Sequence, residues 1–208
     1  DGVVGGTTDL GDVLINSATN VTADAALSAS SFTQSAGTGT TTLTGTIDIN
    51  ANFDFTGSAL TFSGTGNTVG GTFEVTNAGV FTTSDSSDIV VSSTFVQNGG
   101  GSNTIGDDIT ATSIEFATGV TLTSGTGSDE IVFTSGGGAG QDITFSQTLD
   151  NADDELVKFN AGASGDVTVT GAVGAFGTGD ITIVNAANVL FSSTVSADDF
   201  IQTAGTGT

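Results

Sequence analysis

An internal repeat constrains the fold of this chain more than any other feature of the sequence. Residues 28–40 return as residues 196–208, and nine of the thirteen positions are identical. The match extends upstream in the same register, so residues 11–40 are equivalent to residues 179–208. An ordered match of this length is more than the coincidence expected of a Gly/Thr-rich chain, and it indicates a fold built by adding like units along an axis.

The repeat also predicts the domain organisation. Residues 1–208 are expected to form one continuous segment, made of one 168-residue repeat and about 40 residues of the next. The sequence stops inside a Gly-Thr-Gly-Thr motif, with no polar capping unit after it. Because an uncapped end exposes unpaired strand edges, we expect further copies of the same repeat to follow or to stack head to tail.

Apolar residues alternate with polar ones, which predicts β-strands. In one long stretch seven alternate residues are expected on one face of a strand, namely Leu43, Gly45, Ile47, Ile49, Ala51, Phe53 and Phe55. Shorter β-branched or aromatic segments recur at residues 73–75, 89–91, 114–116, 120–122, 131–133, 143–145, 156–159, 167–169 and 181–183.

Short strands without Pro or Trp favour a right-handed parallel β-solenoid (β-helix) over the alternative, tandem β-sandwich domains. An apolar content of 36% is low for a globular chain but suits a thin core that is distributed along an axis. Coils of roughly 20–28 residues would place roughly 6–8 coils in each repeat. At about 4.8 Å for each coil, one repeat would extend roughly 30–40 Å.

The charge limits the partners that the chain can have. One basic residue faces 23 acidic ones, and the net charge is −22. Such a surface repels nucleic acid and anionic lipid, whereas divalent cations are its natural counter-ions. No apolar run is long enough to insert in a membrane. The acidity and the absence of cysteine suit an extracellular protein of the bacterial cell surface.

Three segments together carry a family resemblance: residues 13–21, the Ser-Ala-x-x-Phe-x-Gln-x-Ala-Gly-Thr-Gly-Thr-Thr-Thr-Leu-Thr-Gly run that ends at Gly45, and residues 167–174. They resemble the long repeats of giant bacterial "β-strand repeat" surface proteins, which are grouped with filamentous-haemagglutinin-like and autotransporter-adhesin-like β-helices. The resemblance covers essentially the whole chain. It implies a secreted, very long protein that serves in adhesion, in extracellular fibres or in a cell-envelope coat.

The residue types argue against catalysis. The chain has no His, Cys, Tyr, Trp or Arg, so a nucleophilic triad lacks its base and a sugar site lacks its stacking and orienting groups. The glycine-rich residues 136–140 have no basic neighbour that could bind phosphate, and they are interpreted as a turn between coils. We therefore expect no enzyme activity and no catalytic or cofactor-binding residues.

Calcium is the one ligand for which the sequence offers candidates, because Ca²⁺ prefers oxygen ligands. The candidate metal ligands are Asp107, Asp108, Asp150, Asp153 and Asp154. Two further acidic pairs are 129–130 and 198–199. No EF-hand or calcium-roll motif occurs. The alternative interpretation is that these side chains are solvated loop charges that keep a β-rich fold soluble.

The function that we expect is that of a non-enzymatic structural or adhesive repeat segment. One alternative is a subunit of a surface-layer coat. Another is an ice-binding solenoid, since Thr-x-Thr pairs occur at residues 38–40, 44–46, 110–112, 121–123 and 168–170. Ice binding requires a threonine row on every coil, and the irregular spacing of these pairs predicts no such row.

Overall fold

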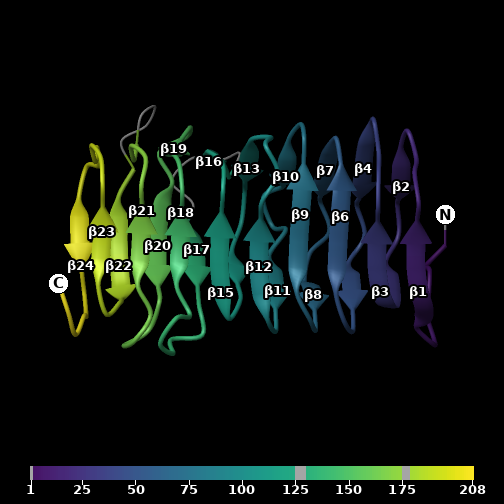
Figure 1. The fold of residues 1–208 in the computed structure, drawn as a ribbon, viewed down its shortest axis with the longest axis horizontal. Coiled ribbons are helices and arrows are strands. Elements are labelled where there is room, and N and C mark those ends of the chain that lie inside the picture. The colour runs from purple at the N-terminus through teal and green to yellow at the C-terminus, as the bar shows by residue number, and fades with distance from the viewer. Residues whose placement is uncertain (1, 125–129, 175–178) are drawn as a thin grey trace.

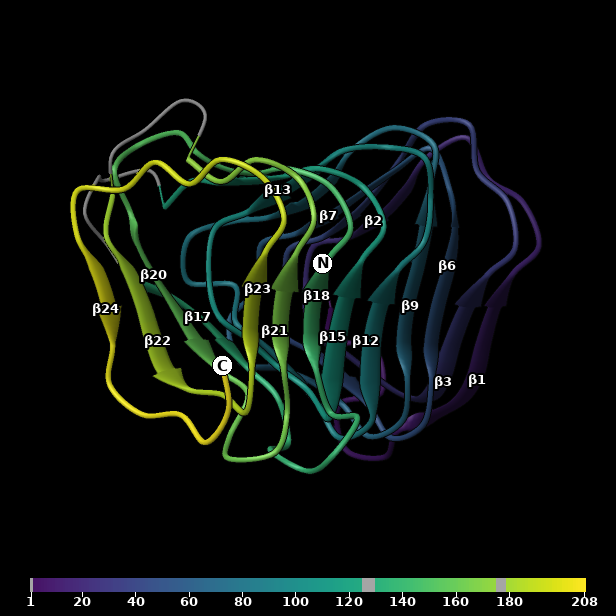
Figure 2. The same ribbon diagram turned by 60° about the vertical axis from the view of Figure 1, so that its left-hand side comes forward.

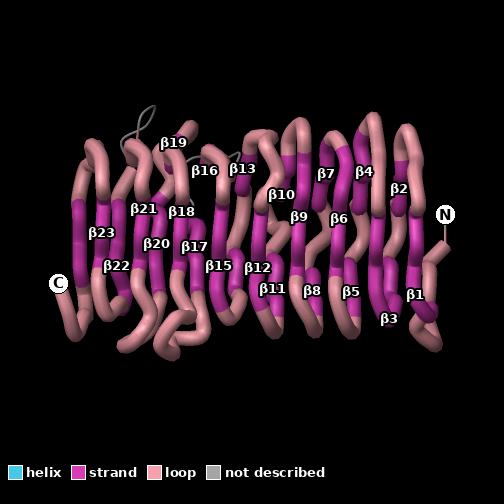
Figure 3. The backbone as a smooth tube through the Cα atoms, viewed as in Figure 1, coloured by secondary structure: helices cyan, strands magenta, loops and turns pink. Residues whose placement is uncertain are grey.

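The computed structural model describes residues 2–124, 130–174 and 179–208. Its strands wind into a β-solenoid of about nine turns, which stand side by side along one long axis (Figures 1 and 3). Every strand pairing within the described ranges is parallel, and this excludes the β-sandwich alternative. The described residues contain no helix that is long and apolar enough to cross a membrane.

The turns have three faces, of which the first and second together form a 17-stranded sheet. The first face consists of the start of β3 and of the strands that pair with it, one after another, in the following turns. These are β3 (Leu27–Gln34), β5 (Ile47–Ile49), β8 (Asn67–Val69), β11 (Ile89–Val91), β14 (Ile109–Thr110), β17 (Glu130–Thr134), β20 (Leu156–Asn160), β22 (Ile181–Asn185) and β24 (Phe200–Gln202).

The second face uses the end of β3, which turns the corner between the two faces. The other strands of this face are β1 (Leu10–Ile15), β6 (Phe53–Gly57), β9 (Phe73–Asn77), β12 (Thr94–Gln97), β15 (Ser113–Phe116), β18 (Ile143–Phe145), β21 (Val167–Val169) and β23 (Val189–Phe191). They lie next to one another across the middle of Figure 2.

The third face is a separate parallel sheet of seven strands. In spatial order they are β2 (Val21–Ala23), β4 (Thr40–Leu43), β7 (Ala59–Phe62), β10 (Phe81–Thr83), β13 (Asn103–Ile105), β16 (Val120–Leu122) and β19 (Leu149–Asn151). Isolated bridges continue this column from Leu149 to Val173 and on to Val195.

The length of a turn follows from the register between neighbouring strands, and it is not constant. The first turn is short, because Val13 pairs with Phe32. A later turn is much longer, because Ile114 pairs with Ile143. The shorter of these two turns therefore has one residue fewer, and the longer has one residue more, than the range of roughly 20–28 residues expected from the sequence. The glycine-rich residues 136–140 lie in the longest turn, between β17 and β18.

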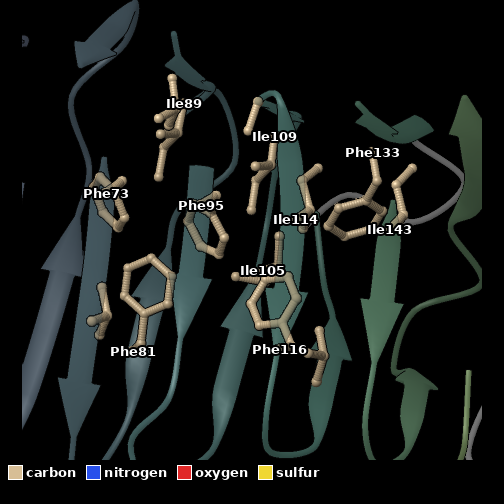
Figure 4. Close-up of a cluster of buried hydrophobic side chains, with 14 of the residues drawn as sticks. Phe73, Phe81, Ile89, Phe95, Ile105, Ile109, Ile114, Phe116, Phe133 and Ile143 are labelled. Atoms are coloured by element: carbon tan, nitrogen blue, oxygen red, sulfur yellow. The ribbon is translucent and has the colours of Figure 1, made fainter. Parts of the chain in front are cut away.

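The core is a stack of inward side chains, with aromatic rings at its centre (Figure 4). Phe32, Phe53, Phe73 and Phe95 come from successive turns of the second face and are all fully buried. Their rings stack with centroids 4.6, 4.8 and 5.1 Å apart. Offset stacking of this kind adds about 0.5–1.5 kcal/mol for each pair beyond the burial of apolar area.

A group of buried amide side chains occupies part of the interior between the second and third faces. The Gln97 side-chain amide donates to Asn77 Oδ1 at 2.7 Å and to the Gly99 carbonyl at 3.0 Å. Its oxygen accepts a hydrogen bond from the Thr118 hydroxyl at 3.0 Å and from Asn103 Nδ2 at 3.3 Å. These bonds satisfy both ends of the Gln97 amide, as burial requires, whereas the buried Asn103 Oδ1 has no hydrogen-bond partner among the described residues.

The long alternating stretch from Leu43 to Phe55 is not a single strand, and that prediction was wrong. It contains the end of β4, all of β5 and the start of β6, so the chain turns two corners within it. Ala51, expected on the inward side, is exposed in the second corner. The two-residue alternation continues through both corners, so the pattern of apolar residues does not reveal where the chain turns.

The two copies of the repeat form the same local hydrogen bonds. Ser35 N–H donates to the Ile15 carbonyl at 2.9 Å, and the equivalent Thr203 N–H donates to the Ile183 carbonyl at 2.8 Å. Asn20 Oδ1 accepts a hydrogen bond from Thr40 N–H at 3.0 Å. At the equivalent positions, Asn188 Oδ1 accepts one from Thr208 N–H at 3.2 Å. The pairing of Val13 with Phe32 likewise recurs as that of Ile181 with Phe200.

Equivalent residues of the two copies nevertheless lie on different faces. Val13 belongs to the second face in the first turn, whereas Ile181 belongs to the first face near the other end of the solenoid. Val21 lies on the third face, and its equivalent Val189 lies on the second. One repeat is therefore one face short of eight complete turns, and each copy is rotated by one face about the solenoid axis relative to the previous copy.

Candidate functional site

Asp107 and Asp108 lie in the turn that leads from β13 into β14. Asp107 Oδ1 accepts a hydrogen bond from Asp108 N–H, and Asp108 Oδ1 accepts one from Val132 N–H, both at 2.7 Å. Partial burial raises the pKa of both carboxyls above the ordinary value, and the hydrogen bonds that they accept oppose this rise. Nearby carboxylates, including Asp88, raise both pKa values further.

Asp150, Asp153 and Asp154 lie at or just after β19, on the third face. Asp150 is buried within the strand and is the register partner of Thr121. Asp153 Oδ2 accepts a hydrogen bond from the Thr123 hydroxyl at 2.7 Å. Asp154 is exposed and has a positive φ of 65°, which marks the sharp turn before β20. These carboxylates are thus part of a turn that joins two faces.

A buried carboxylate that the sequence analysis did not single out belongs to Glu155. Its side chain is fully buried and accepts a hydrogen bond from Ser124 N–H at 2.7 Å. The Glu155 backbone is held on both sides by the Asn151 side-chain amide, at 2.7 and 3.0 Å. This carboxylate fixes the backbone of a neighbouring turn, which accounts for its burial without a ligand.

The acidic residues do not combine into a metal centre in the described part of the chain. Within residues 2–124, 130–174 and 179–208, no group of three or more carboxylates is placed to hold a metal ion. Asp129 lies outside the described residues, and Glu130 forms an ion pair with Lys158. The pair at 198–199 is exposed on the last turn, where Asp199 N–H donates to Asp180 Oδ1 at 3.1 Å.

The two ends of the solenoid expose apolar side chains. At the first turn Val4, which is the register partner of the buried Leu27, is 40% exposed, and at the last turn Phe200 is 49% exposed. The equivalent of Phe200 in the first copy is Phe32, which is 1% exposed because the ring of Phe53 stacks on it. The first copy thus shows that an aromatic ring of the next turn would cover Phe200 if a further turn followed.

The third face carries a regular feature, a line of outward threonines. We name as the threonine row the six that are register partners in consecutive turns, Thr22, Thr42, Thr61, Thr82, Thr104 and Thr121. Each lies between two residues whose side chains point inward. Asp150 occupies the next position in the column.

The Thr-x-Thr pairs of the sequence do not reveal this row. Of those pairs only the one at residues 121–123 contributes to the row, through Thr121. The signal that identifies the row is an outward threonine in each of six successive third-face strands, from β2 to β16, and it ends at β19, where Asp150 takes this position. The pairs themselves form no row, as expected, whereas single threonines form one over six consecutive turns that ends at Asp150.

The comparisons with known proteins add no family to these observations. No protein-family model, no curated protein and no solved structure matches this chain.

Proposed function

We propose that this chain is a non-enzymatic structural segment of an extracellular bacterial surface or fibre-forming protein, in which repeats add end to end along one solenoid. The single observation that carries the proposal is the recurrence of the same pairing at both ends of the solenoid. Val13 pairs with Phe32 as Ile181 pairs with Phe200. Repeats that stack in this way interact only with their neighbours, so length can grow without any change of fold.

The composition supports an extracellular and non-catalytic role. The chain carries 23 acidic residues and one basic residue, and it contains no His or Cys. A high negative charge keeps a long β-rich surface soluble and suppresses edge-to-edge aggregation. Acidic side chains that are not gathered into one site, as in the described part of the chain, suit a spacer or an adhesive surface better than they suit the binding and orientation of a substrate.

The rotation of each copy by one face about the solenoid axis would suit an adhesive role. Because equivalent residues move by one face in each repeat, any patch carried by every repeat would point in three directions in turn along an array. Three successive copies would present such a patch on all three faces. An array of this kind can engage a surface whichever side it approaches, without any change in the sequence of the repeat.

A tandem chain tests the proposal directly. Residues 41–208 are appended after Thr208, which is the equivalent of Thr40, so that the repeat continues in phase. One repeat is one face short of eight turns, so the maximum dimension measured by small-angle X-ray scattering should increase by about 37 Å. A single, cooperative thermal transition at a higher temperature than that of the original chain should accompany this.

Phe200→Asp provides a control for the junction. In the original chain Phe200 is about half exposed, so this substitution should change the melting temperature little. In the tandem chain the same side chain should be buried as Phe32 is, and the substitution should destabilise the protein strongly. Two rods joined by a flexible hinge, or equal effects of Phe200→Asp in both chains, would contradict the proposal.

A further inference from the structure

The threonine row is an ordered array with a fixed spacing. Its members are register partners in a parallel sheet, so successive residues are separated by the strand spacing of about 4.8 Å. Threonine is β-branched and therefore restricted at χ1, which limits the directions in which its hydroxyl and methyl groups can point. The row thus presents one hydroxyl and one methyl group in each turn, at a nearly constant period.

The hydroxyls of the row are available to solvent. In the described ranges no hydrogen bond joins any of the six hydroxyls to another protein group. Elsewhere threonine hydroxyls are used within the protein, as when Thr68 donates to Asp48 at 2.8 Å and Thr46 donates to the Thr65 carbonyl at 3.0 Å. The middle of the third face therefore offers water a set of donors and acceptors that the fold itself does not use.

The third face is also uncharged where the row runs. The strands β2, β4, β7, β10, β13 and β16 contain no Asp, Glu, Lys or Arg, although the chain has 23 acidic residues. The second face is different, because Asp54, Glu74 and Glu115 point outward from its strands. A charge holds its own hydration shell, and its absence lets water above this face adopt the order that the array favours.

From these observations we propose that the third face binds ice through the threonine row. Water oxygens in ice repeat along one crystal axis at a spacing slightly shorter than the strand spacing of a β-sheet. Hydroxyls at that period can replace lattice waters, while the methyl group beside each hydroxyl leaves water to order around it. This is a second activity, and it does not depend on the structural role proposed above.

The size of the face argues against a second copy of the chain as its occupant. Six turns and three-residue strands give an area about 24 Å long and about 10 Å wide, or about 240 Å². Two such faces would bury about 480 Å² in total, which is less than the approximately 1,000 Å² of a stable protein interface.

Thermal hysteresis measured by nanolitre osmometry on the full chain tests the proposal. The wild-type protein should depress the freezing point below the melting point and should shape growing ice crystals. Thr82→Lys places a charge in the middle of the row and should abolish both effects. The matched control is Thr168→Lys on the second face, where Thr168 also lies outward between buried valines, and it should behave as wild type.

Two further measurements keep the result interpretable. Circular dichroism establishes that each variant is folded, and Thr82→Ser, which keeps the hydroxyl and removes the methyl group, should reduce the hysteresis in a folded protein. A wild-type protein that freezes as the buffer does would overturn the proposal. So would full activity in a folded Thr82→Lys variant, or a wild-type dimer in sedimentation that Thr82→Lys converts into a monomer.

Discussion

Phe53 and Phe73 stack with ring centroids 4.8 Å apart and an angle of 8° between the ring planes. They are register partners on the second face, one turn apart, and both are fully buried. Each ring also contacts the next aromatic residue in the column, because Phe32 stacks on Phe53 and Phe95 stacks on Phe73. The core is therefore continuous along the axis, and removal of one ring affects the packing of the turns on both sides.

Replacement of Phe73 by alanine should destabilise the protein by about 3–5 kcal/mol. The substitution removes two stacking contacts and leaves a cavity between Phe53 and Phe95. Urea unfolding followed by circular dichroism measures the change in the free energy of unfolding. Phe200→Ala is the matched control, because Phe200 is 49% exposed on the last turn, and it should cost less than about 1 kcal/mol. Equal losses in the two variants would refute the role given to the stack.

The sequence predicted the strands of the solenoid well where a turn of the chain coincided with a break in the apolar pattern. The segments at residues 114–116, 143–145 and 167–169 are β15, β18 and β21 as expected, and their parallel stacking confirms the solenoid prediction. The corners between Leu43 and Phe55 could not be predicted in the same way. Gly45 and Asn50–Asn52 mark these corners, but the alternation of apolar and polar residues in the sequence continues across both.

The surface was harder to predict than the core. The threonine row depends on which residues of different turns become neighbours, and the turns vary in length, as the pairings of Val13 with Phe32 and of Ile114 with Ile143 show. No constant period in the sequence could therefore align the members of the row with one another. The surroundings of the acidic candidates depend on the fold in the same way, because carboxylates close in sequence, such as those at 107–108, accept hydrogen bonds from backbone groups of different turns.

The stability of the protein should increase as the pH falls from neutral towards about 4. Burial raises the pKa of Asp107, Asp108 and Asp54 above that of an aspartate in the unfolded chain. The folded state then binds more protons than the unfolded state, so stability is fully present below the unfolded pKa and is lost as the pH rises through the folded pKa. Asp9 acts in the opposite direction, because hydrogen bonds from Ser28 and Asn50 lower its pKa.

Asp108→Asn tests the origin of this pH dependence. The asparagine oxygen can still accept the hydrogen bond from Val132 N–H, but the side chain no longer carries a buried charge. The variant should melt at a higher temperature than wild type at pH 7, and the difference should disappear near the unfolded pKa. Asp198→Asn, at an exposed site on the last turn, is the control for net charge. An equal gain from Asp198→Asn would assign the effect to net charge and not to burial.

Divalent cations should stabilise the protein without a preference for calcium. In the described ranges no three carboxylates are placed to form a metal centre, whereas the net charge of −22 makes general screening favourable. Millimolar Ca²⁺ and Mg²⁺ should therefore raise the melting temperature equally, and added NaCl should reduce the effect of both. Calcium-specific stabilisation that saturates at a fixed stoichiometry and is lost in Asp107→Asn would instead establish a site at that turn.

Two adjacent glycines have opposite surroundings and give the sharpest test of packing between turns. A Cβ atom at Gly101 would overlap the Gly79 carbonyl oxygen of the preceding turn and would lie 2.8 Å from Asn77 Nδ2, whereas a Cβ atom at Gly100 would have no heavy atom within 4 Å. Gly101→Ala should therefore destabilise the protein by about 1–3 kcal/mol, because the two turns must separate. Gly100→Ala should be neutral or stabilising by up to about 1 kcal/mol, since it restricts the unfolded chain. Chemical denaturation of both variants decides the matter, and similar stabilities would mean that the turns do not approach each other as closely as the structure places them.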